Sequence, residues 1–216
     1  MADSETDVTP IIAALSPERL AAYGRATADD DVAAVRLYAW NLAASGALYE
    51  ALSVAEVVLR NALSAQLAVH HGNLPGHWYN DPRGVLTEEA HEDIAVARAR
   101  VRKRRHPETP GRVVAELGFG FWKFLLARRY ESTLWTGHLR HAFPHLRPQS
   151  RATAHAAVDD LHLLRNRVAH QEPIHGRDLN RDVVTLYRLL QWIDPEVRIW
   201  AVSLSRLPHV LAARPV

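Results

Sequence analysis

The chain carries an apolar repeat that fits an α-helix and does not fit a β-strand. Between positions 47 and 69, apolar residues recur at intervals of three and four, which places them on one side of a helix. These residues are Leu48, Leu52, Ala55, Leu59, Leu63 and Leu67. Alternating strand patterns and hairpin turn pairs are scarce elsewhere in the sequence. The sequence therefore predicts an all-α fold with this stripe in its core.

Helix start and stop signals predict further helices along the chain. Ser16 and Pro17 are typical of an N-cap followed by the first helical residue. Asp29–Asp31 precede a helix that we expect to end near Ser45-Gly46, before the apolar helix begins at Ala47. Further helices are predicted to start after Thr87 and to cover about residues 130–142, 148–171, 179–193 and 195–204.

Length and composition predict one domain. The chain has 216 residues, and 48% of them are hydrophobic, which is ordinary for a globular protein with a sizeable core. No low-complexity linker separates one part from another. We expect residues 1–15 to form a flexible tail and residues 16–216 to form a single helical domain.

Several classes of protein are disfavoured by the sequence. There is no cysteine, which excludes disulfide frameworks, thiolate zinc sites and a cysteine nucleophile. The acidic and polar first residues do not resemble a signal peptide. The apolar run Leu48–Val69 contains Glu50, Glu56 and Arg60, so we interpret it as a core helix and not as a membrane span. A cytoplasmic protein without a membrane partner is expected.

The segment LHLLRNRVAHQEPIHG, from Leu161 to Gly176, has the strongest chemical potential. Asn166 and His170 are four residues apart and share a helix face, and Arg165 is long enough to reach it. Pro173 disfavours helical geometry at the preceding residue, so His170 lies near the helix end. A guanidinium binds phosphate bidentately, and an imidazole transfers protons near neutral pH. This combination fits metal-free cleavage of a phosphodiester, with a purely structural helix end as the alternative.

A second Leu-Arg-Asn sequence occurs in the long apolar helix, at Arg60 and Asn61. One reading places both Arg-Asn pairs in one polar pocket. The other treats the repeat as a coincidence in a chain rich in leucine and arginine. Glu56 lies one turn before Arg60, and a pair between these two side chains would be structural, worth a few tenths of a kcal/mol if exposed.

The RNRVAHQEPI segment resembles the Arg-Asn-x-x-x-His motif of HEPN-type ribonucleases, in the form found in Abi-like (abortive infection) proteins. The resemblance extends over about residues 19–200. Further similar blocks are LYAWN at 37–41, LYEALSVAEVVLRNAL at 48–63, HWY at 77–79, ELGFGFW at 116–122 and LRHAFP at 139–144.

The resemblance implies an antiparallel helical bundle with additional peripheral helices that pairs as a homodimer. It implies an endoribonuclease that needs no metal or cofactor, in which the RNA 2′-hydroxyl attacks the adjacent phosphate at a composite site. Arg165 would bind phosphate, Asn166 would orient His170 or its neighbours, and His170 would be the acid or base. The residues placed beside the RNA substrate are Arg60, Asn61, Glu56, Arg167 and Glu172.

The resemblance also implies a defence role, as a toxin with a protein or RNA antitoxin. One departure bears on activity. The family often has a second histidine where this chain has Gln171. His175 is expected to be an exposed loop residue. The alternative is that it replaces the second histidine of the family. A catalytically inactive HEPN module that binds RNA or protein, or a structural partner of a nuclease, is therefore the alternative function.

Two further patterns bear on RNA binding and on metal binding. The basic run Arg98–Arg105 is consistent either with contacts to an RNA backbone or with a solvated helix end. His162 and His170 are about 12 Å apart along a helix, which is too far for one metal ion. The sequence therefore predicts no metal site.

Overall fold

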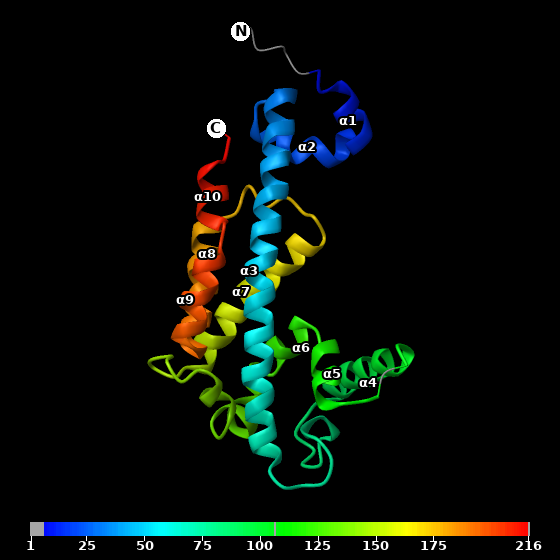
Figure 1. Cartoon of the computed structure of the whole chain (residues 1–216), viewed down its shortest axis with the longest axis vertical. Helices are drawn as coiled ribbons and strands as arrows, with labels where there is room; N and C mark the ends of the chain where they lie inside the picture. Colours follow the sequence, from blue (N-terminus) through cyan, green and yellow to red (C-terminus); the bar gives the residue numbers. More distant parts are fainter. Residues whose placement is uncertain (1–6, 106, 216) are drawn as a thin grey trace.

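The computed structural model describes residues 7–105 and 107–215, and all regular secondary structure in them is helical (Figure 1). The all-α prediction is confirmed for this part of the chain. The helices are α1 (Thr9–Leu15), α2 (Pro17–Ala26), α3 (Asp31–His71), α4 (Glu88–Lys103), α5 (Pro110–Glu116), α6 (Phe119–Phe124), α7 (Arg151–Ala169), α8 (Leu179–Ile193), α9 (Pro195–Leu204) and α10 (Leu207–Ala212). Short 3₁₀ and π turns lie at Trp78–Asn80, Arg128–Tyr130, Glu131–Trp135 and Leu139–Ala142.

Helix α3 runs without interruption for 41 residues, about 62 Å at 1.5 Å per residue. The predicted break near Ser45-Gly46 is wrong. A Cβ atom at Gly46 would lie 3.1 Å from the Arg206 guanidinium, which forms an ion pair of 3.0 Å with Glu50. The glycine therefore makes room for a side chain that docks on α3 from the far end of the chain.

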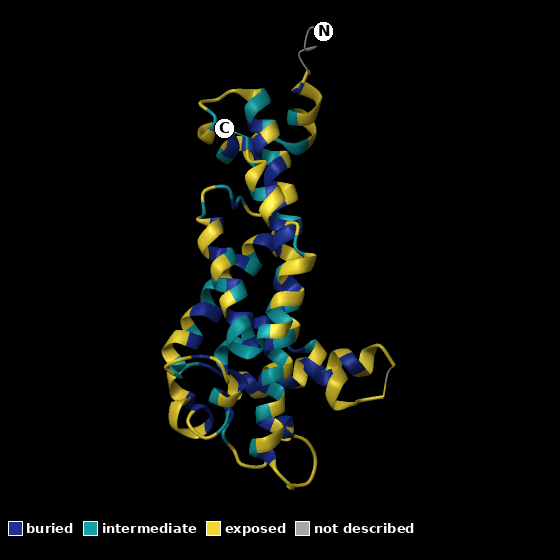
Figure 2. Cartoon of the chain, turned by 60° about the vertical axis from the view of Figure 1, so that its left-hand side comes forward, coloured by how far each residue is buried: buried dark blue, intermediate teal, exposed yellow. Residues whose placement is uncertain are grey.

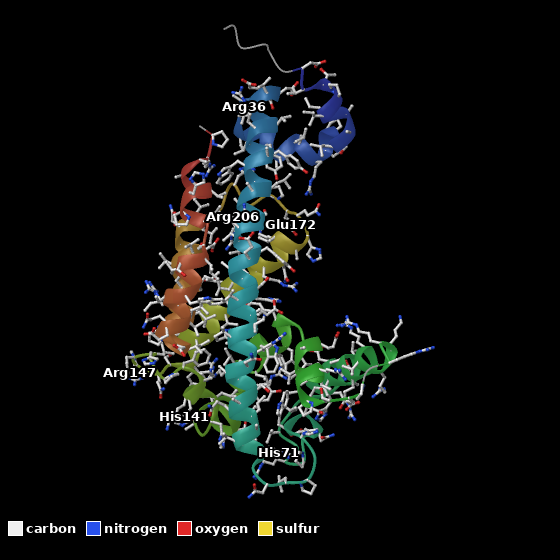
Figure 3. The ribbon with its side chains drawn as sticks, in the orientation of Figure 1. Arg36, His71, His141, Arg147, Glu172 and Arg206 are labelled. Atoms are coloured by element: carbon white, nitrogen blue, oxygen red, sulfur yellow. The ribbon has the colours of Figure 1, made fainter. Side chains whose placement is uncertain are left out.

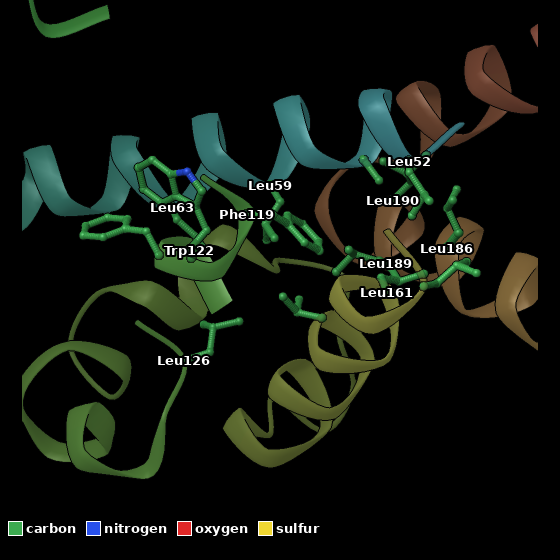
Figure 4. Close-up of a cluster of buried hydrophobic side chains, with 14 of the residues drawn as sticks. Leu52, Leu59, Leu63, Phe119, Trp122, Leu126, Leu161, Leu186, Leu189 and Leu190 are labelled. Atoms are coloured by element: carbon green, nitrogen blue, oxygen red, sulfur yellow. The ribbon is translucent and has the colours of Figure 1, made fainter. Parts of the chain in front are cut away.

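The predicted apolar stripe of α3 forms the core of the molecule. Each of its six side chains is at most 2% exposed. Figure 4 shows Leu59 and Leu63 facing Phe119 and Trp122 of α6, while Leu52 faces leucines of α8. Figure 2 shows buried positions recurring along the lengths of the helices, between exposed ones. One long helix therefore organises most of the core.

Helices α7, α8 and α9 alternate in direction (Figure 1). Helices α8 and α9 are joined only through Asp194, so they form an antiparallel pair (Figure 1). Helix α7 also runs opposite to α3, because Asn41 near the start of α3 meets Ile174, which follows the end of α7. The Trp40 indole donates to the Val210 carbonyl at 2.8 Å and fixes α10 against the same end of α3.

Asn41 is a buried polar residue in the LYAWN segment, with 2% of its surface exposed. Its Oδ1 accepts hydrogen bonds from the backbone nitrogens of Ile174 at 2.8 Å and His175 at 3.1 Å. His175 is only partly exposed, and its ring lies 4.9 Å from that of Tyr23. The expectation that His175 is an exposed loop residue is therefore wrong, because Asn41 draws this loop against α3.

The start of the chain differs from the expected tail in part. Residues 9–15 form helix α1, which packs against α2, although its side chains are mostly exposed. The expectation for residues 1–6 falls outside the described part of the chain. The Ser16 side chain accepts from the Arg19 backbone nitrogen and starts α2 as predicted.

By length and composition alone, α3 also meets the criterion for a membrane-spanning helix. A core helix of a bundle meets the same criterion. Helix α3 packs along its length against α2, α7, α8 and α10, and its charged residues Glu50 and Glu56 form ion pairs with other helices. Packing within the bundle accounts for its apolar character.

Asn41 provides a test of how the loop after α7 is held. Asn41→Ala should lower the free energy of unfolding by about 1–3 kcal/mol, because two backbone N–H groups lose their acceptor. Asn61→Ala, at an exposed site on the same helix, should change it by no more than about 0.5 kcal/mol. Urea denaturation measures both values, and equal effects would contradict this role of Asn41.

Candidate active site

The end of helix α7 is fixed by its backbone. The nitrogen of Glu172 donates to the carbonyl of Arg167 at 2.8 Å, and the nitrogen of Gln171 donates to that of Val168 at 3.1 Å. Gln171 has a φ of 56°. These features define a Schellman motif with a left-handed residue at 171 and His170 as the C-cap. The helix therefore ends at His170, as the following proline predicts.

His170 is exposed at this helix end. Its backbone nitrogen donates to the Asn166 carbonyl at 2.9 Å, and its imidazole is open to solvent. Glu172, labelled at the end of α7 in Figure 3, forms an ion pair of 3.7 Å with Arg167 and not with Arg165. The carbonyl of Gln171 accepts a hydrogen bond from the Arg19 guanidinium of α2. The imidazole is thus accessible on a firmly held backbone.

Arg165 points toward α3. Its Nε lies 3.6 Å from Oε2 of Glu56, and the two side chains are 36% and 22% exposed. This ion pair joins the two helices that contain the Leu-Arg-Asn sequences. The structure therefore brings Glu56 together with Arg165 across two helices, and not with Arg60 one turn away.

The second Arg-Asn pair divides between two environments. Arg60 is partly buried, and its Nε is enclosed without a hydrogen-bond partner among the described residues. Asn61 is exposed. Of this pair, only Arg60 carries a charge, and one nitrogen of its guanidinium is enclosed.

Asn166 contacts the histidine one turn before it. Its Nδ2 lies 3.3 Å from Nε2 of His162, and the Nδ1 of His162 is buried without a partner in the described residues. The predicted role of Asn166 was to orient His170 or its neighbours. Among the described residues, the side chain of Asn166 is hydrogen-bonded to His162 and not to His170, so the predicted role stays a prediction.

His162 lies where α6 meets α7. Its ring is 5.8 Å from that of Phe119, and a Cβ atom at Gly120 would lie 3.4 Å from its Nε2. Burial lowers the pKa of His162, and the positive charges of Lys123 and Arg165 lower it further. This histidine is therefore mainly neutral at pH 7 and is suited to hold Asn166 in place.

The α6 side of the site is closed by an ion pair of 3.0 Å between Lys123 and Asp159. The sequence contains the four-residue spacing of His162 and Asn166, but it gives no sign of the α6 contacts.

In the described part of the chain, no three His, Cys, Asp or Glu side chains are placed to hold a metal ion.

The arrangement has two chemical capacities. Arg165 and Arg60 supply permanent cations for an anionic ligand, with Glu56 as the internal partner that a phosphate would compete with. His170 supplies an accessible imidazole at the C-cap of α7. Cation and proton carrier therefore lie on the last two turns of α7.

Partly buried histidines give the protein a predicted pH dependence. Burial lowers the pKa of His70, His162 and His175 below the ordinary value of 6.5. As the pH falls below about 6.5, the unfolded chain therefore binds more protons than the folded chain, and the free energy of unfolding decreases.

Urea denaturation between pH 7.5 and pH 5.5 measures this loss. His162→Gln should make the decrease in the free energy of unfolding smaller, because the His162 imidazole no longer contributes to it. His141→Gln, at an exposed site, is the control and should leave the decrease unchanged. Stability that is constant or increases toward pH 5.5 would contradict the assignment.

Comparison of the chain with protein-family models, with curated proteins and with solved structures finds no match in any of the three. The HEPN resemblance consequently stays a prediction that depends on the quoted motifs.

Proposed function

We propose that the chain is a metal-independent endoribonuclease with a HEPN-like antiparallel bundle, and that its active site forms when two copies pair. The observation that carries the proposal is the end of α7. It presents an exposed His170 on a fixed backbone, one and a half turns after an arginine that faces the other Leu-Arg-Asn helix.

The reaction balances with these groups alone. A base removes the proton of the 2′-hydroxyl, the 2′-oxygen attacks the adjacent phosphorus, and the bond to the 5′-oxygen breaks. An acid then protonates that leaving oxygen. The products are a 2′,3′-cyclic phosphate and a 5′-hydroxyl. Arg165 would stabilise the negative charge that develops on the phosphate oxygens.

A second copy supplies what one chain lacks. The reaction uses one base and one acid, and each chain presents one exposed imidazole beside the motif, since His162 is partly buried and bonded to Asn166. Two copies of His170 across a shared cleft would provide both groups.

Exposed apolar side chains on α3 and α7, the two helices joined by the Glu56–Arg165 pair, support such pairing. Tyr49 and Val57 of α3 are 55% and 41% exposed, and Leu163 of α7 is 50% exposed. Large exposed apolar side chains are typical of surfaces that another protein covers. A homodimer through α3 and α7 would bury them.

The proposed setting is the cytoplasm, in an abortive-infection or toxin–antitoxin system. Cleavage of cellular or phage RNA would stop translation, and a protein or RNA antitoxin would restrain it.

The alternative is a catalytically inactive HEPN module that binds RNA or protein. Two contacts favour it, because Glu56 and His162 satisfy Arg165 and Asn166 within one chain. Gln171 also favours the inactive module, because the HEPN family often has a histidine at this position. In that case, the motif serves the helix end and the dimer.

Cleavage of RNA in the presence of EDTA separates these functions. The native chain should cut RNA to cyclic-phosphate ends, and His170→Ala and Arg165→Ala should each reduce the rate by about 10²–10⁴-fold. His141→Ala and Arg36→Ala, at exposed sites elsewhere, should leave the rate unchanged.

Circular dichroism must show that the variants are folded. Absence of cleavage by the native chain, or equal cleavage by His170→Ala, would contradict the nuclease function and favour the binding module.

A further inference from the structure

Positive charge is concentrated in residues 98–116. This segment contains seven basic and two acidic residues, a net charge of +5, while the whole chain has a net charge of +2. The rest of the chain is therefore net acidic. Such an asymmetry indicates a local anionic contact and not bulk attraction.

The segment projects from the bundle. The second half of α4 and helix α5 form a hairpin that extends from the side of the molecule (Figure 1), and its outer surface is exposed (Figure 2). Buried Val101, Val113 and Val114 hold the two helices together. We call residues 98–116 the basic arm.

Three basic residues of the arm are used in its own folding. Arg98 and Arg102 lie 2.7 Å and 3.3 Å from the carboxylate of Glu108, and Arg104 lies 2.6 Å from that of Glu116. These pairs tie α4 to the segment that returns along it.

Three others point outward. Arg100, Lys103 and Arg105 are exposed, and no ion pair joins them to another of the described residues. A helix C-terminus favours cations only within its last turn. It does not account for Arg105, which has a φ of 55° and lies beyond the helix. The arm therefore keeps a set of unpaired cations on a fixed framework.

The arm leads by a short connection to α6, which contacts His162 of α7. Helix α5 ends at Glu116, and after Leu117 and Gly118 the chain enters α6 at Phe119. The Phe119 ring lies 5.8 Å from that of His162. An RNA strand bound to the arm would therefore approach the site from the side of α6.

We propose that the basic arm is a phosphate-binding surface that holds the RNA backbone beside the candidate active site. This inference rests on RNA as the substrate of the proposed function. Residues 98–116 contain no Phe, Trp or Tyr, so the segment lacks the large rings on which single-stranded bases usually stack. The arm therefore binds phosphates independently of base sequence, and it binds DNA as it binds RNA.

The salt dependence of binding tests this proposal. The probe is a fluorescein-labelled 20-nucleotide 2′-O-methyl RNA, which cannot be cut by 2′-hydroxyl attack. Its dissociation constant is measured by anisotropy between about 50 and 200 mM salt for the full-length chain. The triple variant Arg100→Gln, Lys103→Gln and Arg105→Gln should reduce the log–log slope by about 2, because each lost contact to a single strand contributes about 0.7.

A matched control removes the same charge elsewhere. Arg25→Gln, Arg36→Gln and Arg188→Gln change three exposed arginines of α2, α3 and α8, and this triple variant should keep the native slope. Figure 3 shows Arg36 at the opposite end of α3 from the arm. A DNA probe of the same sequence should give the native slope as well.

The outcomes separate the arm from the nuclease. A native chain that binds no oligonucleotide overturns the inference, and so does an arm variant with the native slope. Normal binding that the arm variant weakens, together with no cleavage of natural RNA, supports the arm and contradicts the nuclease function.

Discussion

The structure depends on one helix that buries a continuous apolar stripe over most of its length. Helices α6, α7, α8 and α10 all meet α3, so their relative positions are set by where they contact it. Asn41 near its start holds the loop after α7, and Glu56 near its middle holds Arg165. The end of α7 is therefore positioned by two polar contacts to α3. Burial of the apolar stripe between the helices supplies most of the stabilising free energy.

This arrangement explains why the motif at the end of α7 has an ordered backbone and an accessible side chain together. The Schellman motif and the Asn41 contacts fix the chain on both sides of Glu172, while His170 stays exposed. Arg165 is held more loosely, by an ion pair that is partly exposed, and such a pair contributes at most about 1 kcal/mol. Under the proposed function, a phosphate would replace Glu56 as the partner of Arg165 at little cost in stability.

Local features were predictable from the sequence, and distant contacts were not. The caps at Ser16 and Thr87 start their helices as predicted, because capping depends on neighbouring residues. The predicted helix break at Gly46 was wrong. The glycine makes room for the Arg206 side chain, which is far away in the sequence, so its role could not be predicted locally. His162 was missed for the same reason: its spacing to Asn166 is visible, but the packing of α6 against it is not. The HEPN resemblance, the dimer and the nuclease activity stay predictions.

The central claim is that two copies of the chain bring their His170 side chains to one cleft. The native sequence contains no cysteine, so His170→Cys provides one thiol per chain. Treatment of this variant with a short bis-maleimide should give a covalent dimer in high yield, whereas Glu196→Cys, at an exposed site on α9, should not. A chain that sediments as a monomer, with no more cross-linking at position 170 than at position 196, would contradict the account.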